Sequence, residues 1–268
     1  MSVPVLLEVK KDIAHVWLNR PEKYNALDLD MFNAIVDAGE KICGDPSIRA
    51  VVLSGKGPGF CAGLDFKRFK GMASRGKNSD SPLLARENGA IANLVQQVSV
   101  IWKQVPVPVI AALHGVAFGG GFQIAMGADI RLAEPDTRFS VMEIKWGIIP
   151  DMSITQTLRD LVRLDVAKEL TFTGRIVEAN EAAELGLITR VCQSPLEEAE
   201  KLAEEIAGKS PHAVAAAKEL YESTWHATMQ EGLLKEEALQ RTLIGTPNQT
   251  EAVKSNLEKR SPVYRDRT

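Results

Sequence analysis

The fold is decided by the stretch His114-Gly115-Val116-Ala117-Phe118-Gly119-Gly120-Gly121-Phe122-Gln123-Ile124-Ala125-Met126-Gly127-Ala128-Asp129-Ile130. The apolar run before it, residues 107–113, predicts a buried strand, and the apolar, Ala-rich run after the three glycines predicts a helix. A helix start has unpaired backbone N–H groups and a partial positive charge, and glycines allow a ligand to approach the backbone closely. Taken alone, the turn is compatible with two roles: holding a developing oxyanion, or only packing a helix against a strand.

The composition of the chain indicates a globular protein and argues against nucleic-acid and membrane partners. The chain has 268 residues, of which 45% are hydrophobic and 25% charged, values typical of a soluble globular domain. The net charge is -3 with no long basic run, so we expect no nucleic-acid partner. No apolar run is long enough to span a bilayer, so we expect no membrane partner either.

Cysteine and histidine spacing gives no indication of a metal site. Cys43, Cys61 and Cys192 are scattered, and the four histidines show no ligand spacing, so we expect no metal. An odd number of cysteines and an N-terminus without a secretion-signal pattern predict a reducing compartment, and therefore a cytoplasmic protein.

Hydrophobic patterning predicts an α/β fold. The expected strands are residues 5–10 and 13–18 as a hairpin, then 50–53, 129–133 and 138–141, and the expected helices run from Asp28 or Asp30 to about 43 and from about 83 to 103. Such alternation of strands and helices is typical of α/β proteins.

The C-terminal part of the chain is expected to be helical. Ser194-Pro195, Ser210-Pro211 and Thr246-Pro247 each place proline where a helix begins, and we expect capping boxes over 194–197 and 246–249. We therefore divide the chain into an α/β core, residues 1–194, and a helical region, residues 195–268.

Two loops are candidates for binding a carbonyl oxygen. The loop Ala62-Gly63-Leu64-Asp65 follows a predicted strand, and Gly119-Gly120-Gly121 begins a predicted helix. Backbone N–H groups from two separate loops can bind one oxygen, and each donor typically lowers a barrier by roughly 3 kcal/mol when charge develops on that oxygen.

Glu143 and Asp151 are the candidate acid–base residues. They flank an apolar stretch that contains Trp146, and a carboxylate in such surroundings has a raised pKa, which suits proton transfer. The alternative is that Glu143 caps a helix and Asp151 begins the next one; spacing alone leaves both possibilities open. Gly147 and Pro150 make a continuous helix between them unfavourable, and the chain has no Gly-x-Ser-x-Gly elbow of an α/β-hydrolase.

Several separated motifs in the right order resemble the crotonase superfamily, the enoyl-CoA hydratase/isomerase family. The motifs are Asn19-Arg20-Pro21 with Asn25-Ala26-Leu27, then Phe60-Cys61-Ala62-Gly63-Leu64-Asp65, then residues 108–112 through Gly119-Gly120-Gly121 to Ala128-Asp129-Ile130, and finally Phe172-Thr173-Gly174-Arg175 with Glu181-Ala182 and Gly186-Leu187. The match covers nearly the whole chain.

The resemblance implies a crotonase-like spiral of ββα units with a C-terminal helical region that forms trimers, often paired into hexamers. It implies an acyl-CoA thioester as substrate and no separate cofactor. The thioester oxygen would lie between the N–H groups of Leu64 and Gly120. The substrate contacts that we assign on this basis are Lys23, Ala62, Asp65, Gln123 and Trp146. The loop 68–82 is expected to shape the acyl pocket.

Gln123 departs from the family's pattern. Family hydratases have a glutamate at each of two positions, and here the first is Gln123, which cannot take up a proton at neutral pH, while the second is Glu143. Family members that move a double bond can work with one carboxylate at the second position, and dienoyl-CoA isomerases also use an aspartate that matches Asp151. The resemblance therefore favours an isomerase in which Glu143 removes a proton and Asp151 assists.

Other functions remain open from the sequence. The chain is alternatively an enoyl-CoA hydratase, or a dehalogenating relative in which Asp151 is a nucleophile. It is alternatively an acyl-CoA-binding scaffold without turnover, or an unrelated glycine-loop protein whose motifs match by chance. Acyl-CoA turnover and CoA binding distinguish these possibilities.

Overall fold

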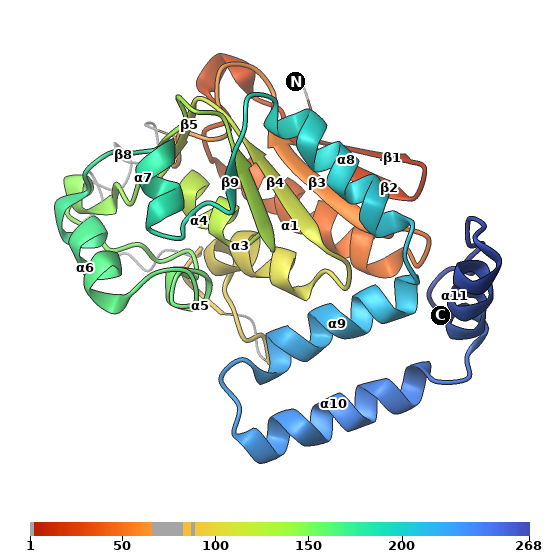
Figure 1. The fold of residues 1–268 in the computed structure, drawn as a ribbon. Helices are drawn as coiled ribbons and strands as arrows, with labels where there is room; N and C mark the ends of the chain where they lie inside the picture. The colour runs from red at the N-terminus through yellow and green to blue at the C-terminus, as the bar shows by residue number, and fades with distance from the viewer. Residues whose placement is uncertain (1–2, 66–82, 87–88) are drawn as a thin grey trace.

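The computed structural model describes residues 3–65, 83–86 and 89–268. Its main sheet has the strand order β1-β2-β3-β4-β6-β9, in which only β1 is antiparallel to its neighbour (Figure 1). The strands are β1 (Val5–Lys10), β2 (Ile13–Leu18), β3 (Ala50–Gly55), β4 (Val109–Leu113), β6 (Ile130–Ala133) and β9 (Arg190–Val191). The expected α/β class and the N-terminal hairpin are confirmed.

Helices cover both faces of this sheet, so its central strands β2, β3 and β4 are apolar on both sides. On one face, Val51, Leu53 and Val109 pack in the core with α1 (Leu29–Gly44) and α3 (Leu94–Gln104). On the other face, Val52 and Ile110 pack against Ala199 and Ala203 of α8 (Pro195–Ala207). The alternation of side chains along each strand thus supplies two separate apolar layers.

A second sheet carries the glycine turn. It has the order β5-β7-β8, with β5 (Val116–Phe118), β7 (Arg138–Ser140) and β8 (Val177–Glu178), and β5 runs directly into α4 (Gly120–Met126). The shorter helical elements are η1 (Pro21–Lys23), η2 (Glu143–Trp146), α5 (Ile154–Thr157), α6 (Leu164–Thr173) and α7 (Ala179–Glu184). The strand expected over residues 107–113 is β4, and the helix expected after the three glycines is α4, so both are confirmed, whereas the short strand β5 between them was not expected.

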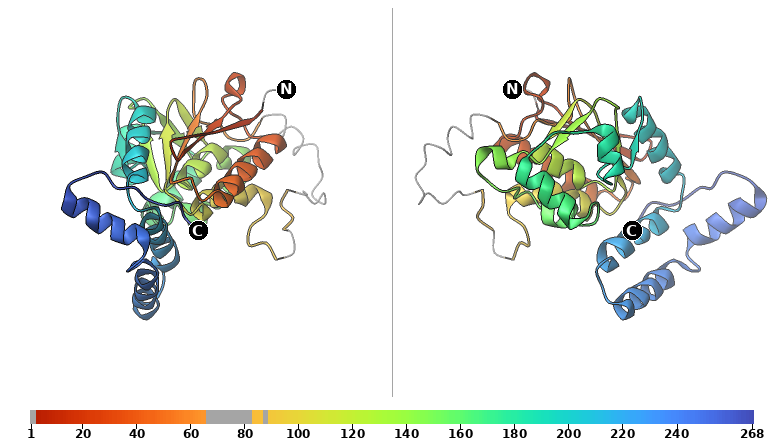
Figure 2. Two further views of the ribbon diagram at one scale, coloured as in Figure 1. Left: turned by 90° about the vertical axis from the view of Figure 1, so that its right-hand side faces the viewer. Right: turned by 60° about the vertical axis from the view of Figure 1, so that its left-hand side comes forward.

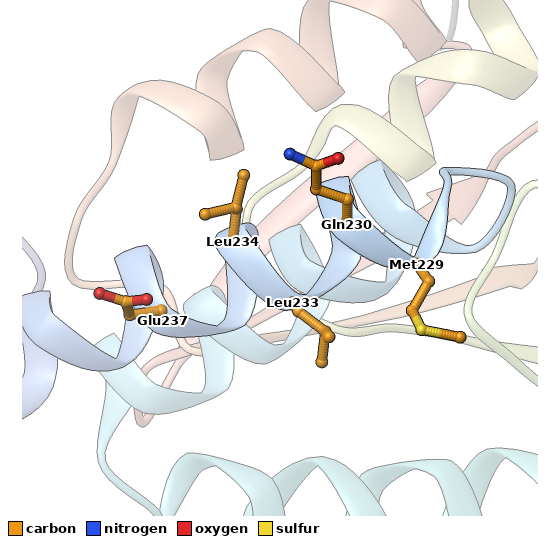
Figure 3. A pocket seen from close by; sticks show the side chains of 5 residues that line it. All are labelled: Met229, Gln230, Leu233, Leu234 and Glu237. Atoms are coloured by element: carbon orange, nitrogen blue, oxygen red, sulfur yellow. The ribbon is translucent and has the colours of Figure 1, made fainter.

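The last three helices project from the core. They are α9 (Pro211–Thr224), α10 (Met229–Leu243) and α11 (Pro247–Glu258), and Figures 1 and 2 show them leaving the core on one side. Figure 3 shows apolar side chains on α10, where Met229, Leu233 and Leu234 are all more than half exposed. Exposed apolar surface of this kind is typical of an interaction site, and assembly into trimers or hexamers stays a prediction. Within the described residues no helix is long and apolar enough to cross a membrane.

Some helix boundaries differ from the expectation. The helix expected from about residue 83 begins at Leu94, because Asn93 and Gln96 form a capping box there. Ser194 makes no side-chain capping bond, so the box expected over 194–197 is absent although Pro195 does begin α8. At the second expected box, the Thr246 side chain accepts from the Gln249 N–H. The loop expected to shape the acyl pocket, residues 68–82, lies outside the described residues.

Candidate active site

The loop that contains Leu64 is held in place by the buried side chain of Asn25. The Asn25 Nδ2 atom donates to the carbonyls of Lys56 and Gly59, both at 2.9 Å, and of Phe60 at 3.0 Å. Its Oδ1 atom accepts from the Arg20 N–H at 2.7 Å. One amide thus joins the N-terminal segment to the stretch that precedes the first candidate oxyanion donor.

Leu27 fixes the direction of the Leu64 N–H. The Leu27 N–H donates to the Gly63 carbonyl at 2.8 Å, and the Leu27 carbonyl accepts from the Asp65 N–H at 2.9 Å. In an extended chain, the N–H of the intervening residue points to the opposite side from these two bonds. No acceptor in the described part of the chain pairs with the Leu64 N–H.

The second donor is the Gly120 N–H, in the first turn of α4. Gly119 turns the chain into this helix with a φ of 52° and donates its own N–H to the Ser140 carbonyl at 2.9 Å. The Gly120 N–H belongs to the first turn, which has no intrahelical acceptor, and none of the described residues accepts from it. A Cβ atom placed on Gly63 would lie 3.4 Å from this nitrogen, so the two candidate loops are in contact.

Glu143 lies against the glycine turn. Its side chain is 8% exposed, and a Cβ atom on Gly119 would be 3.3 Å from its Oε1 atom. Oε1 accepts a hydrogen bond from Nε2 of Gln123 at 2.7 Å, whereas Oε2 is buried and has no hydrogen-bond partner among the residues that the structure describes. Burial raises the pKa of the Glu143 carboxyl, the Gln123 bond opposes that rise, and the nearby Asp151 charge adds to it.

Gln123 and Asp151 complete the surroundings of this carboxylate. Gln123 is fully buried on α4, and its Oε1 atom accepts from the Met152 N–H at 2.9 Å. Asp151 directly precedes Met152, and although it keeps contact with solvent, partial burial raises the pKa of its carboxyl. No continuous helix joins the two carboxylates, as the sequence predicts, because η2 ends at Trp146 and is followed by Gly147 with a φ of 70°.

The remaining predicted substrate contacts lie around the first loop and at the end of η2. Lys23 Nζ is 3.4 Å from Asp65 Oδ2, which also pairs with Arg20 at 3.2 Å. The Ala62 N–H donates to the Tyr24 carbonyl, and Trp146 is 43% exposed at the end of η2. Roles in binding substrate stay predictions for these residues.

Sequence reasoning did not single out three contributors to the site. Asn25 and Arg20 belong to the N-terminal motif, but their use as anchors of a loop some forty residues ahead has no local signal. Met152 contributes through its backbone N–H, which any residue except proline supplies. In the described ranges, no group of three or more His, Cys, Asp or Glu side chains is placed to hold a metal ion.

A family model described as enoyl-CoA hydratase/isomerase matches residues 8–267. The chain belongs to the enoyl-CoA hydratase/isomerase family. Among the relatives of this crotonase-superfamily enzyme, the (E)-benzylidenesuccinyl-CoA hydratase of Thauera aromatica is 32% identical over 98% of this chain and 99% of the relative. A peroxisomal Delta(3,5)-Delta(2,4)-dienoyl-CoA isomerase of Arabidopsis thaliana is 31% identical over 94% of this chain and 92% of the relative.

A solved structure of an enoyl-CoA hydratase has the same fold as this family member. The crystal structure of enoyl-CoA hydratase from Bacillus anthracis superimposes with a TM-score of 0.88 at 30% identity, covering 97% of this chain and 98% of that one. The resemblance inferred from the separated motifs is therefore confirmed. The alternative, that the chain is an unrelated glycine-loop protein whose motifs match by chance, is wrong.

Proposed function

We propose that this enzyme shifts the double bond of an enoyl-CoA thioester, using Glu143 as the base that removes the proton. One observation supports the proposal most directly. The buried Glu143 carboxylate, whose Oε2 atom has no partner within the described ranges, lies against the turn that bears the Gly120 N–H. The residue beside it on α4 is Gln123, an amide that cannot accept a proton at neutral pH.

The first step is removal of a proton from the carbon next to the thioester carbonyl. The Glu143 carboxylate takes this proton, and the electron pair of the broken C–H bond moves onto the thioester oxygen to give a dienolate. The N–H groups of Leu64 and Gly120 donate to that oxygen. Each donor is expected to lower the barrier by roughly 3 kcal/mol, because the negative charge on the oxygen is larger in the transition state than in the substrate.

The second step returns a proton to the far end of the dienolate. The electron pair on oxygen re-forms the carbonyl, the double bond moves by one position, and the new C–H bond takes its proton from Glu143. If Asp151 donates instead, the proton that Glu143 took up must pass to Asp151, so that both carboxyl groups return to their starting states. The substrate and the product have the same composition, so the cycle needs no oxidant, no water and no second substrate. A base with a raised pKa suits this chemistry, since it has to accept and release a proton within one turnover.

Hydration of a 2-enoyl-CoA is the alternative function. It is favoured by relatives named as hydratases, such as that of Thauera aromatica, whereas relatives named as dienoyl-CoA isomerases support the leading proposal. The amide at Gln123 argues against hydration by carboxylates at positions 123 and 143, because an amide can neither take up nor donate a proton in this chemistry.

The deciding experiment is a spectrophotometric assay with a trans-2-enoyl-CoA, a trans-3-enoyl-CoA and a 3,5-dienoyl-CoA. We expect turnover of the 3-enoyl or dienoyl substrate, and its loss in Glu143→Gln. Glu184→Gln, which changes an exposed glutamate on α7, is the matched control and should behave as the unmodified enzyme.

Other outcomes would replace the proposal. Turnover of the 2-enoyl substrate alone identifies a hydratase that works with Gln123. Acyl-CoA binding without turnover of any substrate, and without exchange of acyl protons into deuterated water, identifies a non-catalytic scaffold. If a reaction with an aromatic acyl-CoA is quenched and Asp151 then shows a mass increase, the enzyme follows the dehalogenating alternative.

A further inference from the structure

We propose that Gln123 is a positioning residue that reserves one oxygen of Glu143, Oε2, for proton transfer. The inference rests on the proposed function and goes beyond it, since it names the reacting atom and the group that selects it. The starting point is a chain of two hydrogen bonds, from the Met152 N–H to Gln123 Oε1 at 2.9 Å and from Gln123 Nε2 to Glu143 Oε1 at 2.7 Å.

The first link of this chain fixes the orientation of the Gln123 amide. The backbone N–H of Met152 can only donate, so the amide oxygen must face it and the amide NH2 group must face Glu143. The flipped amide would bring two donors together at Met152 and two acceptors together at Glu143. Because both contacts are buried, neither mismatch would be relieved by water.

The second hydrogen bond, from Gln123 to Glu143, makes the two oxygens of the Glu143 carboxylate different. Oε1 receives the amide N–H and faces Gly119, so it must remain an acceptor in both protonation states of Glu143. A proton on the carboxyl group therefore sits on Oε2, which is buried and pairs with none of the described residues. Oε2 is consequently the atom that takes the proton from the substrate and holds it until it is returned.

The same amide also opposes the effect of burial on the base. Donation to Oε1 favours the charged form of Glu143, whereas burial and the negative charge of Asp151 favour the protonated form. Among the described residues, Asp151 is the charged group that acts on Glu143. Gln123 lies on α4, whose first residue carries one candidate oxyanion donor, so one short helix positions both parts of the proposed machinery.

The test is Gln123→Met, which keeps a similar volume but removes both hydrogen bonds. We expect kcat for the 3-enoyl or dienoyl substrate to fall about tenfold or more, the effect of losing a hydrogen bond to a charged group, with KM changed by less than about threefold. The acid limb of the kcat–pH profile should move to higher pH, because Glu143 loses the donor that favours its charged form. Gln156→Met, at an exposed position on α5, is the matched control and should leave both readouts unchanged.

A second variant guards against a purely structural effect. Gln123→Glu keeps the acceptor for the Met152 N–H and replaces only the donor, so it should retain the folded structure by circular dichroism. Its acid limb should also move to higher pH, because two carboxylates would then share one proton. An unchanged acid limb in both variants overturns the inference, whatever happens to kcat.

The two proposals fail in different ways. If Glu143→Gln abolishes turnover while both Gln123 variants keep the original kcat and pH profile, the isomerase proposal stands and the positioning role is wrong. If Glu143→Gln keeps its turnover, the proposed function fails, and the role of Gln123 fails with it.

Discussion

Leu27 pairs with Leu64 in an isolated parallel bridge, which joins the N-terminal segment to the first candidate oxyanion loop. The two bonds of this bridge engage the amides on either side of Leu64 and leave its own N–H directed to the opposite side. The direction of one candidate catalytic donor is therefore set by residues almost forty positions earlier in the chain. Substitutions in that earlier segment are expected to affect catalysis without touching the substrate.

Asn25→Ala tests this dependence. The variant removes an amide that bonds three buried or half-buried carbonyls of the loop 56–60 and accepts from Arg20. With about 1 kcal/mol for each net hydrogen bond, we expect unfolding in urea to show a loss of about 2–4 kcal/mol, accompanied by a lower kcat. Asn256→Ala, which removes an exposed side-chain bond on α11, is the control. Equal effects of the two substitutions would show that Asn25 does not hold the loop.

Gly63→Ala should damage the oxyanion loop more directly. Gly63 has a φ of 86°, and an added Cβ atom would lie 2.7 Å from the Phe118 carbonyl oxygen, too close for a real contact. The loop must move away from the end of β5, so we expect kcat to fall by about 100-fold, the effect of losing one oxyanion donor.

The control for the Gly63→Ala substitution is Gly89→Ala. Gly89 has almost the same φ, 85°, but no atom of the described residues lies within 4 Å of an added Cβ atom. It should therefore show only the modest cost of placing alanine in the left-handed region, of order 1 kcal/mol, with unchanged kcat. A Gly63→Ala enzyme with full activity would exclude Leu64 as an oxyanion donor.

Glu143→Gln is expected to stabilise the protein at neutral pH while abolishing turnover. Burial raises the pKa of Glu143 in the folded state, so the folded protein becomes less stable as the pH rises from the ordinary glutamate range through that raised pKa. The variant carries no such charge, yet its side-chain oxygen can still accept from Gln123. Urea midpoints should be higher for the variant at pH 7, and the difference should disappear below the ordinary pKa of glutamate. A variant less stable than the parent at pH 7 would contradict this account.

The sequence predicts the parts of this fold that are locally encoded. Residues 5–10 and 13–18 form strands with the expected bounds, because their apolar patterning and the polar turn between them are local properties. The start of α3 is missed by about ten residues, since apolar Leu83 and Leu84 suggest a longer helix and Leu84 lies exposed outside it. The capping box of Thr228 and Glu231, which begins α10, is likewise encoded by residues close together in the sequence.

The candidate site is predicted only where a side chain or a motif marks it. Glu143 and Gln123 stand out by residue type, but their contact joins α4 to η2 across twenty residues, a pairing that spacing does not reveal. The contributions of Leu27 and Met152 are backbone bonds that leave no trace in the identity of the residue. These relationships depend on tertiary packing and required the structure.

Asp151→Asn separates the two proton-transfer steps. Since the negative charge of Asp151 raises the pKa of Glu143, its removal should move the acid limb of kcat to lower pH, opposite to the shift expected for Gln123→Met. If Asp151 assists the return of the proton, the variant should convert the dienoyl substrate about tenfold or more slowly while still exchanging the acyl proton with deuterated water. Asp136→Asn, at an exposed position after β6, is the control. Loss of both exchange and turnover would instead assign to Asp151 the proton removal that we attribute to Glu143.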